Sequence, residues 1–413
     1  MLPTMDTSAL IPHLFRTEFG KITAVLSKLF GMAHVELAED IASETFLAAL
    51  EAWTYKGVPP NPTAWLYVVA KNKAKNHLQR DQLFAAKIVP SIGPLNRAAE
   101  FEVDLSAKNI MDSQLQMLFA ICHPVISAEA QIGLSLRILC GFGIDEIANA
   151  FLTNKETINK RLYRAKEKLR EEQILIAMPS ETEITGRLQP VLTALYLLYN
   201  EGYYSESNDS VVREDLCLEA MRLTYLLIES PLTNLPDVNA LFALMCFHSS
   251  RFPARKKENG EIILYNDQDE NLWNKELIAR GAYYLHQASQ GEYFSRYHIE
   301  ANIAWWHTKK EDTTEKWEAI LQLYNRLLQI SYSPVAALNR TYALAKVKGN
   351  SAAIAEAGKL NLPGNHFYFM LLGELYNGVD NTIAKSHYET ALALAKTQAD
   401  KQTIQKKIAG LTD

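Results

Sequence analysis

The sequence predicts an all-α protein, and three observations carry that prediction. Stretches rich in Ala, Leu, Glu and Lys, which are strong helix formers, run through most of the chain, whereas runs of β-branched residues are few. Apolar residues recur at spacings of three and four, as on a helix with one buried face. The 413 residues include only 18 Gly and 15 Pro, so long helices are permitted. This length predicts two to four domains.

The composition is that of a folded protein in water, with 48% hydrophobic and 22% charged residues. The longest apolar runs, such as Val191–Tyr199, are too short to span a bilayer. The first residues lack the basic segment and apolar stretch of a secretion signal. We therefore expect a cytoplasmic protein with no membrane partner.

Four cysteines, Cys122, Cys140, Cys217 and Cys246, lie far apart and form no CxxC pair. In a reducing cytoplasm they are expected to be small buried apolar residues. No Cys/His pair is repeated at zinc-ligand spacing, and the sequence has neither a glycine-rich phosphate loop nor a nucleophile–base pair. We expect no metal site, no cofactor and no catalytic residue, so the chain is not predicted to be an enzyme.

The first 80 residues predict several amphipathic helices. In one of them, Ile41, Thr45 and Ala48 share a stripe, with Phe46 and Leu50 beside it. Three prolines between residues 57 and 62 then force a turn, after which Thr63 is expected to cap a new helix that begins at Ala64. That helix has apolar residues at helical spacing and basic residues at Lys71, Lys73, Lys75 and Arg80.

A helix-turn-helix is the sharpest local signal, at residues 143–162. A short helix with Ile144, Ile147, Ala148 and Phe151 facing inward is followed by a tight turn and by Asn154, a good N-cap residue. The second helix has a buried stripe and an outward basic face; the stripe is Ile158, Leu162, Ala165 and Leu169, and the face is Lys155, Asn159, Lys160, Tyr163 and Arg164. This pattern favours insertion into a DNA major groove over the alternative, a solvated helical hairpin.

Charge is sorted along the chain, although its net value is only −5. Residues 36–51 contain five acidic residues and no basic one, and residues 155–170 contain seven basic and two acidic residues. Local patches matter more to a phosphate backbone than the chain total does. The acidic segment is therefore expected to dock on a protein and the basic segment on DNA.

The C-terminal half is predicted to stay helical, with interruptions at residues 205–209, 231–237 and 256–271. The spacing of Leu372, Gly373, Tyr376, Ala384, Tyr388 and Ala391 is similar to a tetratricopeptide unit, and ordinary antiparallel helix pairs fit it equally well. Arg251, Arg255, Asp267 and Asp269 are expected to form a buried ion network, with a ligand groove as the alternative.

Several of these segments resemble the extracytoplasmic-function group of sigma-70-type factors. Residues 38–47 resemble the region 2 helix that docks on the RNA polymerase clamp, and residues 64–80 resemble the helix that melts and reads the −10 element. The helix-turn-helix resembles region 4, which reads the −35 element. Short stretches at residues 112–115, 122–124, 196–203, 213–223, 252–255, 267–273 and 333–340 resemble the branch with a long helical extension. Asn76 departs from that branch, which more often has Asp there.

The resemblance implies a set of domains and sites. The domains are region 2 at 1–85, a linker at 86–111, region 4 at 112–172, a linker at 173–189, a helical extension at 190–285 and tetratricopeptide-like repeats at 286–413. The implied −35 contacts are Lys155, Thr157, Asn159, Lys160, Arg161 and Arg164. The implied −10 contacts are Asn61, Trp65, Lys71, Asn72, Lys73, Lys75, Asn76 and Arg80. The implied polymerase contacts are Asp40, Glu44 and Phe46.

These assignments predict an alternative sigma factor that binds the clamp and flap of core RNA polymerase and directs it to promoter DNA. The extension is expected to modulate this activity, with a small molecule or a protein as its candidate regulator. The alternative is a helix-turn-helix regulator with a helical sensor domain that binds DNA without being a polymerase subunit.

Overall fold

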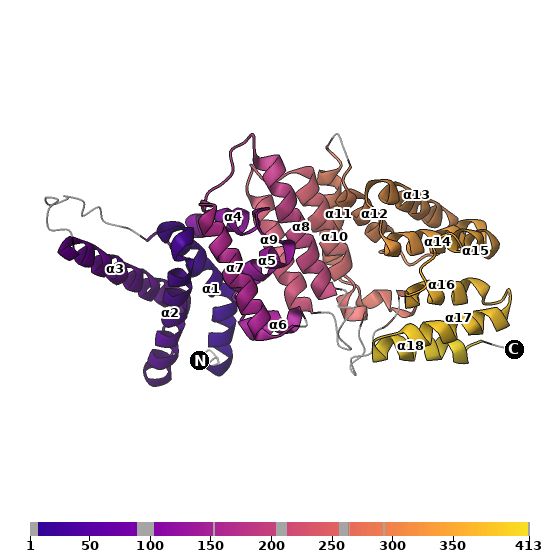
Figure 1. The fold of residues 1–413 in the computed structure, drawn as a ribbon, viewed down its shortest axis with the longest axis horizontal. Helices are drawn as coiled ribbons and strands as arrows, with labels where there is room; N and C mark the ends of the chain where they lie inside the picture. The colour runs from indigo at the N-terminus through magenta and orange to yellow at the C-terminus, as the bar shows by residue number, and fades with distance from the viewer. Residues whose placement is uncertain are drawn as a thin grey trace. The chain divides into compact units, whose positions relative to one another are not determined.

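The computed structural model describes residues 7–88, 103–151, 153–203, 213–255, 263, 265–291 and 294–411. These residues form helices joined by short connections, and no β-strand occurs among them, which confirms the all-α prediction. The chain divides into two compact units, residues 1–197 and 198–413. Figure 1 traces the helices of each unit along the chain.

The first unit contains seven complete α-helices among its described residues and the beginning of an eighth. They are α1 (Thr7–Phe30), α2 (Val35–Lys56), α3 (Pro62–Ile88), α4 (Ala107–Ile121), α5 (Ala128–Leu134), α6 (Ile144–Ala150), α7 (Lys155–Glu171) and α8 (Ile184–Tyr203). A 3₁₀ turn, η1 (Met32–His34), precedes α2, and a π-helical turn, η2 (Ser135–Leu139), follows α5.

Helix α1 is the centre of the first unit, because it packs against α2, α3, α4 and η2. Its Phe19 and Ile22 are fully buried, and Phe15 contacts Phe46 of α2 edge-on, with 5.0 Å between ring centroids. The predicted stripe on α2 is confirmed at Ile41 and Thr45. Leu50, expected beside that stripe, is instead half-exposed, because Ala49 and Trp53 complete the buried face.

The start of α3 differs by two residues from the prediction. The helix begins at Pro62, and the side-chain oxygen of Asn61 accepts a hydrogen bond from the backbone N–H of Ala64 at 3.0 Å. Asn61 is therefore the cap that was assigned to Thr63. Proline is favourable in a first helical turn, where its missing N–H has no helical partner to lose.

The helix-turn-helix forms as the sequence predicts. Asn154 caps α7 by accepting from the N–H of Thr157 at 2.8 Å, and the predicted stripe from Ile158 to Leu169 is buried. Helix α7 packs against α6 and α5. Gly133 of α5 permits this approach, since a Cβ there would lie 2.9 Å from a methyl group of Leu162.

The predicted linkers are only partly within the described residues. Residues 89–102 of the linker at 86–111 lie outside them, and α4 begins at Ala107 with Ser106 as its cap. Helix α8 starts inside the linker predicted at 173–189 and continues past residue 190. Arg187 of α8 donates to the carbonyl of Phe119 at 2.8 Å, so the beginning of this helix belongs to the first unit.

The second unit contains ten further α-helices among its described residues. They are α9 (Glu214–Glu229), α10 (Pro236–Ser249), α11 (Lys275–Ala288), α12 (Arg296–Trp306), α13 (Thr314–Ile330), α14 (Pro334–Lys348), α15 (Asn350–Ala357), α16 (His366–Tyr376), α17 (Asn381–Leu394) and α18 (Gln398–Ala409). Three 3₁₀ turns lie between α10 and α11, namely η3 (Phe252–Ala254), η4 (Tyr265–Asp267) and η5 (Glu270–Leu272).

Helix α10 forms the core of the first half of this unit. It is buried on nearly every side, and it packs against α9, α11 and α12. A helix that is apolar all round is expected to be enclosed in this way. Gly281 of α11 lets the two helices approach, since a Cβ there would lie 2.6 Å from the ring of Phe247.

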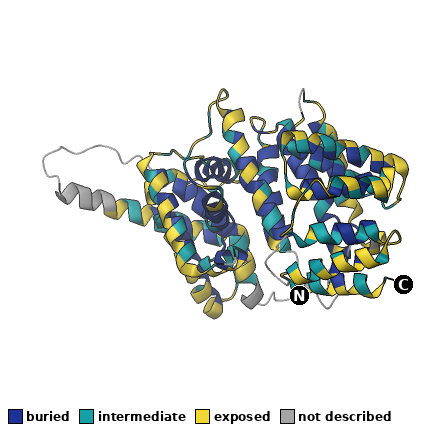
Figure 2. Cartoon of the chain, turned by 45° about the vertical axis from the view of Figure 1, so that its right-hand side comes forward, coloured by how far each residue is buried: buried dark blue, intermediate teal, exposed yellow. Residues whose placement is uncertain are grey.

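From α12 to α18 each helix packs against the next one in the chain, and α16, α17 and α18 lie side by side in Figure 1. Gly373 of α16 receives the ring of Tyr388, which a Cβ would approach to 2.5 Å. Ala384 and Ala391 of α17 are fully buried. The helix pair predicted from this spacing is therefore present. Figure 2 shows the buried residues on the faces that helices turn toward one another.

The four cysteines are free and buried, as predicted. Burial raises the pKa of Cys122 and of Cys246 to about 12. Within the described residues, no helix combines the length and the apolar content needed to cross a bilayer.

The contact between α1 and η2 generates the first testable prediction. A Cβ on Gly20 would lie 2.2 Å from the carbonyl oxygen of Leu139, a backbone atom that cannot move aside without moving η2. Gly20→Ala is therefore expected to lower the free energy of unfolding by about 1–3 kcal/mol, measured by urea titration.

Gly186→Ala is the matched control, because nothing lies within 4 Å of a Cβ at that helical position. Its expected effect has the opposite sign, a gain of about 0.5–1 kcal/mol from helix propensity. Equal effects of the two substitutions would contradict the packing argument.

Candidate nucleic-acid interface

The outward face of α2 carries acidic and apolar side chains together. Asp40, Glu44, Leu47 and Glu51 follow one another at helical spacing, and all four are exposed. Leu47 is 59% exposed, and Tyr55 near the end of the helix is 89% exposed. A mixed face of this kind is typical of a protein-docking surface. The sequence interpretation missed Leu47 and Tyr55, although their position outside the buried stripe could have indicated them.

Phe46 does not belong to this face. It is 5% exposed and lies in the core beside Phe15 of α1. Its predicted role as a polymerase contact is therefore corrected: Phe46 supports the helix from within, because its ring is part of the α1–α2 packing.

The outward face of α3 is rich in amides and bases. Asn72, Asn76 and Arg80 are exposed at successive spacings of four residues, and Val68 extends the same row. Lys75 is also exposed, whereas Lys73 pairs with Glu44 of α2 at 2.7 Å and Lys71 is partly buried. Amide and guanidinium groups in one row offer hydrogen bonds to bases and phosphates.

Two predicted −10 contacts are engaged within the fold. The side-chain oxygen of Asn61 caps α3, and Trp65 packs edge-on against Trp53, with 5.4 Å between ring centroids. Trp65 is partly buried against the core. The structure thus separates these two residues from the exposed row on α3, because each is held by its own helix or by the core.

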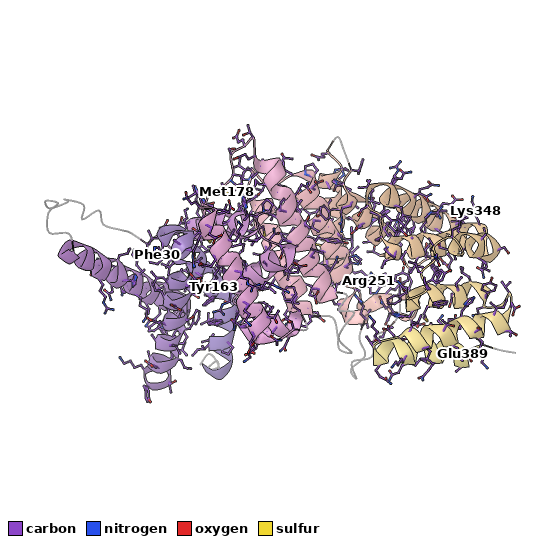
Figure 3. The ribbon with its side chains drawn as sticks, viewed as in Figure 1. Phe30, Tyr163, Met178, Arg251, Lys348 and Glu389 are labelled. Carbon is purple, nitrogen blue, oxygen red and sulfur yellow. The ribbon has the colours of Figure 1, made fainter. Side chains whose placement is uncertain are left out.

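The outward face of α7 holds the predicted −35 contacts. Lys155, Asn159, Lys160 and Arg164 are exposed, and Tyr163, labelled in Figure 3, is 63% exposed beside them. Lys155 pairs with Asp145 at 2.6 Å, but both side chains are more than half exposed, so the pair is weak and exchangeable. This face keeps its basic character.

Thr157 and Arg161, two further predicted contacts, are partly buried. The guanidinium of Arg161 lies 5.6 Å from the ring centroid of Phe151, which closes the turn between the two helices. These two residues therefore lie at the side of the face and also stabilise the turn.

The opposite side of α7 is tied to α2 and η2 by an ion network of Glu36, Glu39, Arg137, Lys166 and Arg170. Glu39 is 5% exposed and accepts from Arg137 at 2.8 Å and from Lys166, which is itself buried. Glu36 lies 3.5 Å from Lys166 and also pairs with Arg170. The acidic segment 36–51 therefore has two faces, and only the face of Asp40, Glu44 and Glu51 points outward.

A second contact joins α1 to the helix-turn-helix. Arg16 of α1 pairs with Glu146 of α6 at 2.6 Å, and its guanidinium lies 3.8 Å from the ring centroid of Phe142. Glu146 also accepts from the N–H of Gly143 at 2.7 Å and so caps α6. The ion network and this contact together fix the orientation of α7 within the first unit.

The ion network was missed at the level of sequence. One signal was available, since Lys166 directly follows Ala165 on the buried stripe of α7, where a lysine needs an acidic partner.

The network predicted in the second unit does not form among the described residues. Asp267 and Asp269 are exposed, Asp269 caps η5, and Arg251 bonds to the Tyr203 hydroxyl instead.

Two known families match separate segments of the chain. Residues 14–83 match the family described as Sigma-70 region 2, which corresponds to most of α1, α2 and most of α3. Residues 187–289 match a family of unknown function, DUF6596, which covers most of α8 and continues through α11. The exposed faces of α2 and α3 thus lie inside the region 2 match.

Two curated proteins are similar to the chain. The uncharacterized protein R00370 of Rhizobium meliloti is 31% identical over 383 residues, which are 91% of this chain and 90% of that protein. The RNA polymerase sigma-H factor of Pseudomonas aeruginosa is 31% identical over 139 residues, which are 32% of this chain and 69% of that factor. No solved structure matches the chain.

The ion network generates the second prediction. Glu39→Gln removes the charge between Arg137 and the buried Lys166, so the first unit is expected to lose about 3 kcal/mol of stability. The measurement is urea-dependent hydrogen exchange in peptides that cover α7.

Glu44→Gln serves as the control on the same helix, because its carboxylate is 59% exposed and, among the described residues, pairs with Lys73 alone. Its expected effect is within about 1 kcal/mol. If both substitutions loosened α7 equally, the buried network would not be what holds that helix.

Proposed function

The chain belongs to the sigma-70 family, to which the similarity with the RNA polymerase sigma-H factor and the region 2 match point, and we propose that it is an alternative sigma factor of the extracytoplasmic-function type. In this role it binds core RNA polymerase and brings it to promoters. Initiation then begins at sites that the factor selects.

The observation that carries the proposal is the pair of exposed faces within the region 2 match. The acidic and apolar face of α2, with Asp40, Glu44 and Leu47, is the polymerase-binding surface. The amide and basic row of α3, with Asn72 and Asn76, contacts the −10 element. Because the two helices pack against each other, protein docking and DNA contact are coupled through one small core.

The helix-turn-helix contributes recognition of the −35 element. A helix that enters the major groove presents the residues of its N-terminal half to base edges, and Asn159 and Lys160 occupy that half of α7. Lys155 and Arg164 flank them and contact phosphates. The buried half of α7, held by Glu36 and Glu39, stays on the protein side.

The overall acidity of the chain fits a factor that works inside a larger enzyme. A protein that binds duplex on its own depends on neutralising phosphates with many basic groups. This chain carries a net charge of −5, and the basic segment at residues 155–170 holds only seven of its 42 lysines and arginines. Core polymerase supplies most of the grip on DNA, and the factor supplies the choice of site.

The second unit is assigned a regulatory role. It is as large as the first unit, and its described residues offer no basic helix face comparable with that of α7. We assign to it control over the output of the first unit.

Run-off transcription tests the proposal. Purified core polymerase is assayed on a genomic promoter library with and without the full chain, and new discrete start sites with shared −35 and −10 elements are expected. The absence of new starts combined with tight duplex binding by the chain alone would instead support a conventional helix-turn-helix regulator. For the responsive promoters, the double variant Lys160→Ala/Arg164→Ala is expected to reduce transcription about tenfold or more. Lys168→Ala is the control, because Lys168 lies on the same helix and is paired with Glu172. It is expected to leave transcription within about twofold of the unmodified chain.

The regulatory role of the second unit has its own test. Gly373→Leu places a large side chain where the ring of Tyr388 lies. It is therefore expected to separate α16 from α17 and to leave the fold of the first unit unchanged. Transcription from a responsive promoter is expected to change at least threefold. Glu389→Lys, at an exposed position of α17, is the control with no expected effect. Unchanged output from the Gly373 variant, with its unfolding confirmed at α16–α17 by hydrogen exchange, would contradict the role.

A further inference from the structure

Two cations are buried in the second unit, and neither pairs with an acid among the residues that the structure describes. Arg251, labelled in Figure 3, follows α10 and is 9% exposed, and Lys316 in the first turn of α13 is 2% exposed. Arginine and lysine are almost never buried unless an acid neutralises them. The burial of Arg251 and Lys316 therefore requires an explanation.

The observed partners of both cations are neutral. Arg251 donates to the hydroxyl of Tyr203 at 3.1 Å and lies 3.4 Å from Nδ1 of His248. Lys316 donates to the carbonyl of Lys309 at 2.6 Å and to the hydroxyl of Tyr265 at 3.2 Å. Among the described residues, no carboxylate forms an ion pair with either cation.

The acid that acts electrostatically on Lys316, Asp312, makes its direct contacts elsewhere. Asp312 pairs with Lys346 at 2.9 Å and accepts from the indole N–H of Trp317. Asp312 is also 56% exposed, so it offsets only part of the charge of Lys316. The charges of Arg251 and Lys316 remain in excess at this place in the fold.

One aromatic ring connects the two cations. The guanidinium carbon of Arg251 lies 5.5 Å, and Nζ of Lys316 lies 5.4 Å, from the ring centroid of Tyr265. His307 contacts the same ring edge-on at 5.2 Å, and Trp273 stacks against it at 6.2 Å. Lys316 also lies 5.6 Å from the ring centroid of Trp317, and such contacts offset only part of two positive charges.

Two hydrogen-bonding groups around this ring are unused. Nδ1 of His307 and the indole Nε1 of Trp273 are both buried and have no hydrogen-bond partner. Burial and the nearby cations lower the pKa of His307 to about 3, so its ring is neutral at neutral pH and can donate through one nitrogen. Buried polar groups without partners are rare, and a missing ligand is one reason for them.

We propose that Arg251, Lys316, His307 and Trp273 form a binding site for a small anion that carries two or more negative charges, such as a phosphate or a dicarboxylate. The cations supply the charge that such an anion requires, and the neutral N–H groups supply directional hydrogen bonds. The site lies wholly inside the second unit and does not depend on polymerase or DNA.

A route for such a ligand lies next to the site. A hollow of about 650 Å³ is lined by Glu270, Thr308, Lys309, Lys310 and Glu311. The carbonyl of Lys309, which accepts from Lys316, belongs to the same segment that lines the hollow. Two lysines and two acids thus line the hollow together, beside the segment that reaches Lys316.

The test is thermal unfolding of the full chain during titration with inorganic phosphate or with succinate, at ionic strength held constant with sodium chloride. A ligand that binds only the folded state raises the unfolding temperature in a saturable way. We expect saturable stabilisation by one of the two anions. The anion that stabilises the chain shows whether the site binds a phosphate or a dicarboxylate.

Arg251→Gln and Lys316→Gln are each expected to weaken the apparent affinity at least tenfold, and Arg251→Lys to weaken it less than Arg251→Gln. Arg280→Gln is the matched control with unchanged affinity, because Arg280 also lies over aromatic rings of this unit, 4.9 Å from the centroid of Tyr225, but is exposed. Trp273→Phe keeps an aromatic ring and removes the unused N–H, so it provides a second variant with intact cations.

Direct binding is measured by the phosphorus-31 line width of phosphate and by calorimetric titration of succinate into the unmodified chain. If neither anion stabilises or binds the chain beyond the chloride reference, the proposal is wrong. The proposal is also wrong if Arg251→Gln binds the anion with the same affinity as the unmodified chain. Where Arg251→Gln does not fold, the proposal is wrong if both Lys316→Gln and Trp273→Phe bind the anion with that same affinity.

Discussion

The first unit depends on one buried carboxylate. Glu39 lies between Arg137 of η2 and Lys166 of α7, so a helix, a π-helical turn and the second helix of the helix-turn-helix meet at a single charge. A buried ion is tolerated only when its partners are placed correctly, because removing one of them leaves an uncompensated charge in the interior. Arg16 and Glu146 repeat the arrangement at a more exposed site. The orientation of the outward face of α7 follows from these contacts.

The same network divides the acidic segment of α2 between two tasks. Glu36 and Glu39 are engaged inside the protein, and Asp40 and Glu44 face outward, although all four lie within nine residues. Helical geometry makes this possible, because positions one residue apart point in directions about 100° apart. A count of charges along the sequence cannot distinguish the two faces, whereas the position of each acid relative to the buried stripe can.

Sequence periodicity was sufficient to predict the helices and the helix-turn-helix, because the buried stripes of α2 and α7 are local patterns. Asn154 was predicted as a cap for the same reason. What the sequence did not reveal are contacts between distant positions, such as Gly20 against the carbonyl of Leu139, and the ion pairs of Glu39 across about 100 and 127 residues. Phe46 and Trp65 were assigned to a binding surface by resemblance, and their place in the core follows from packing against Phe15 and Trp53. The exposed Leu47 and Tyr55 were missed because apolar residues were assumed to be buried.

The buried thiols have a consequence for redox chemistry. With a pKa of about 12, Cys122 and Cys246 are thiolates in only about one molecule in 10⁵ at pH 7, and the thiolate is the form that peroxide attacks. Burial raises the pKa of Cys217 as well. These side chains are therefore poor sites for sulfenic acid formation. Oxidation of these three residues would first require the helices around them to open.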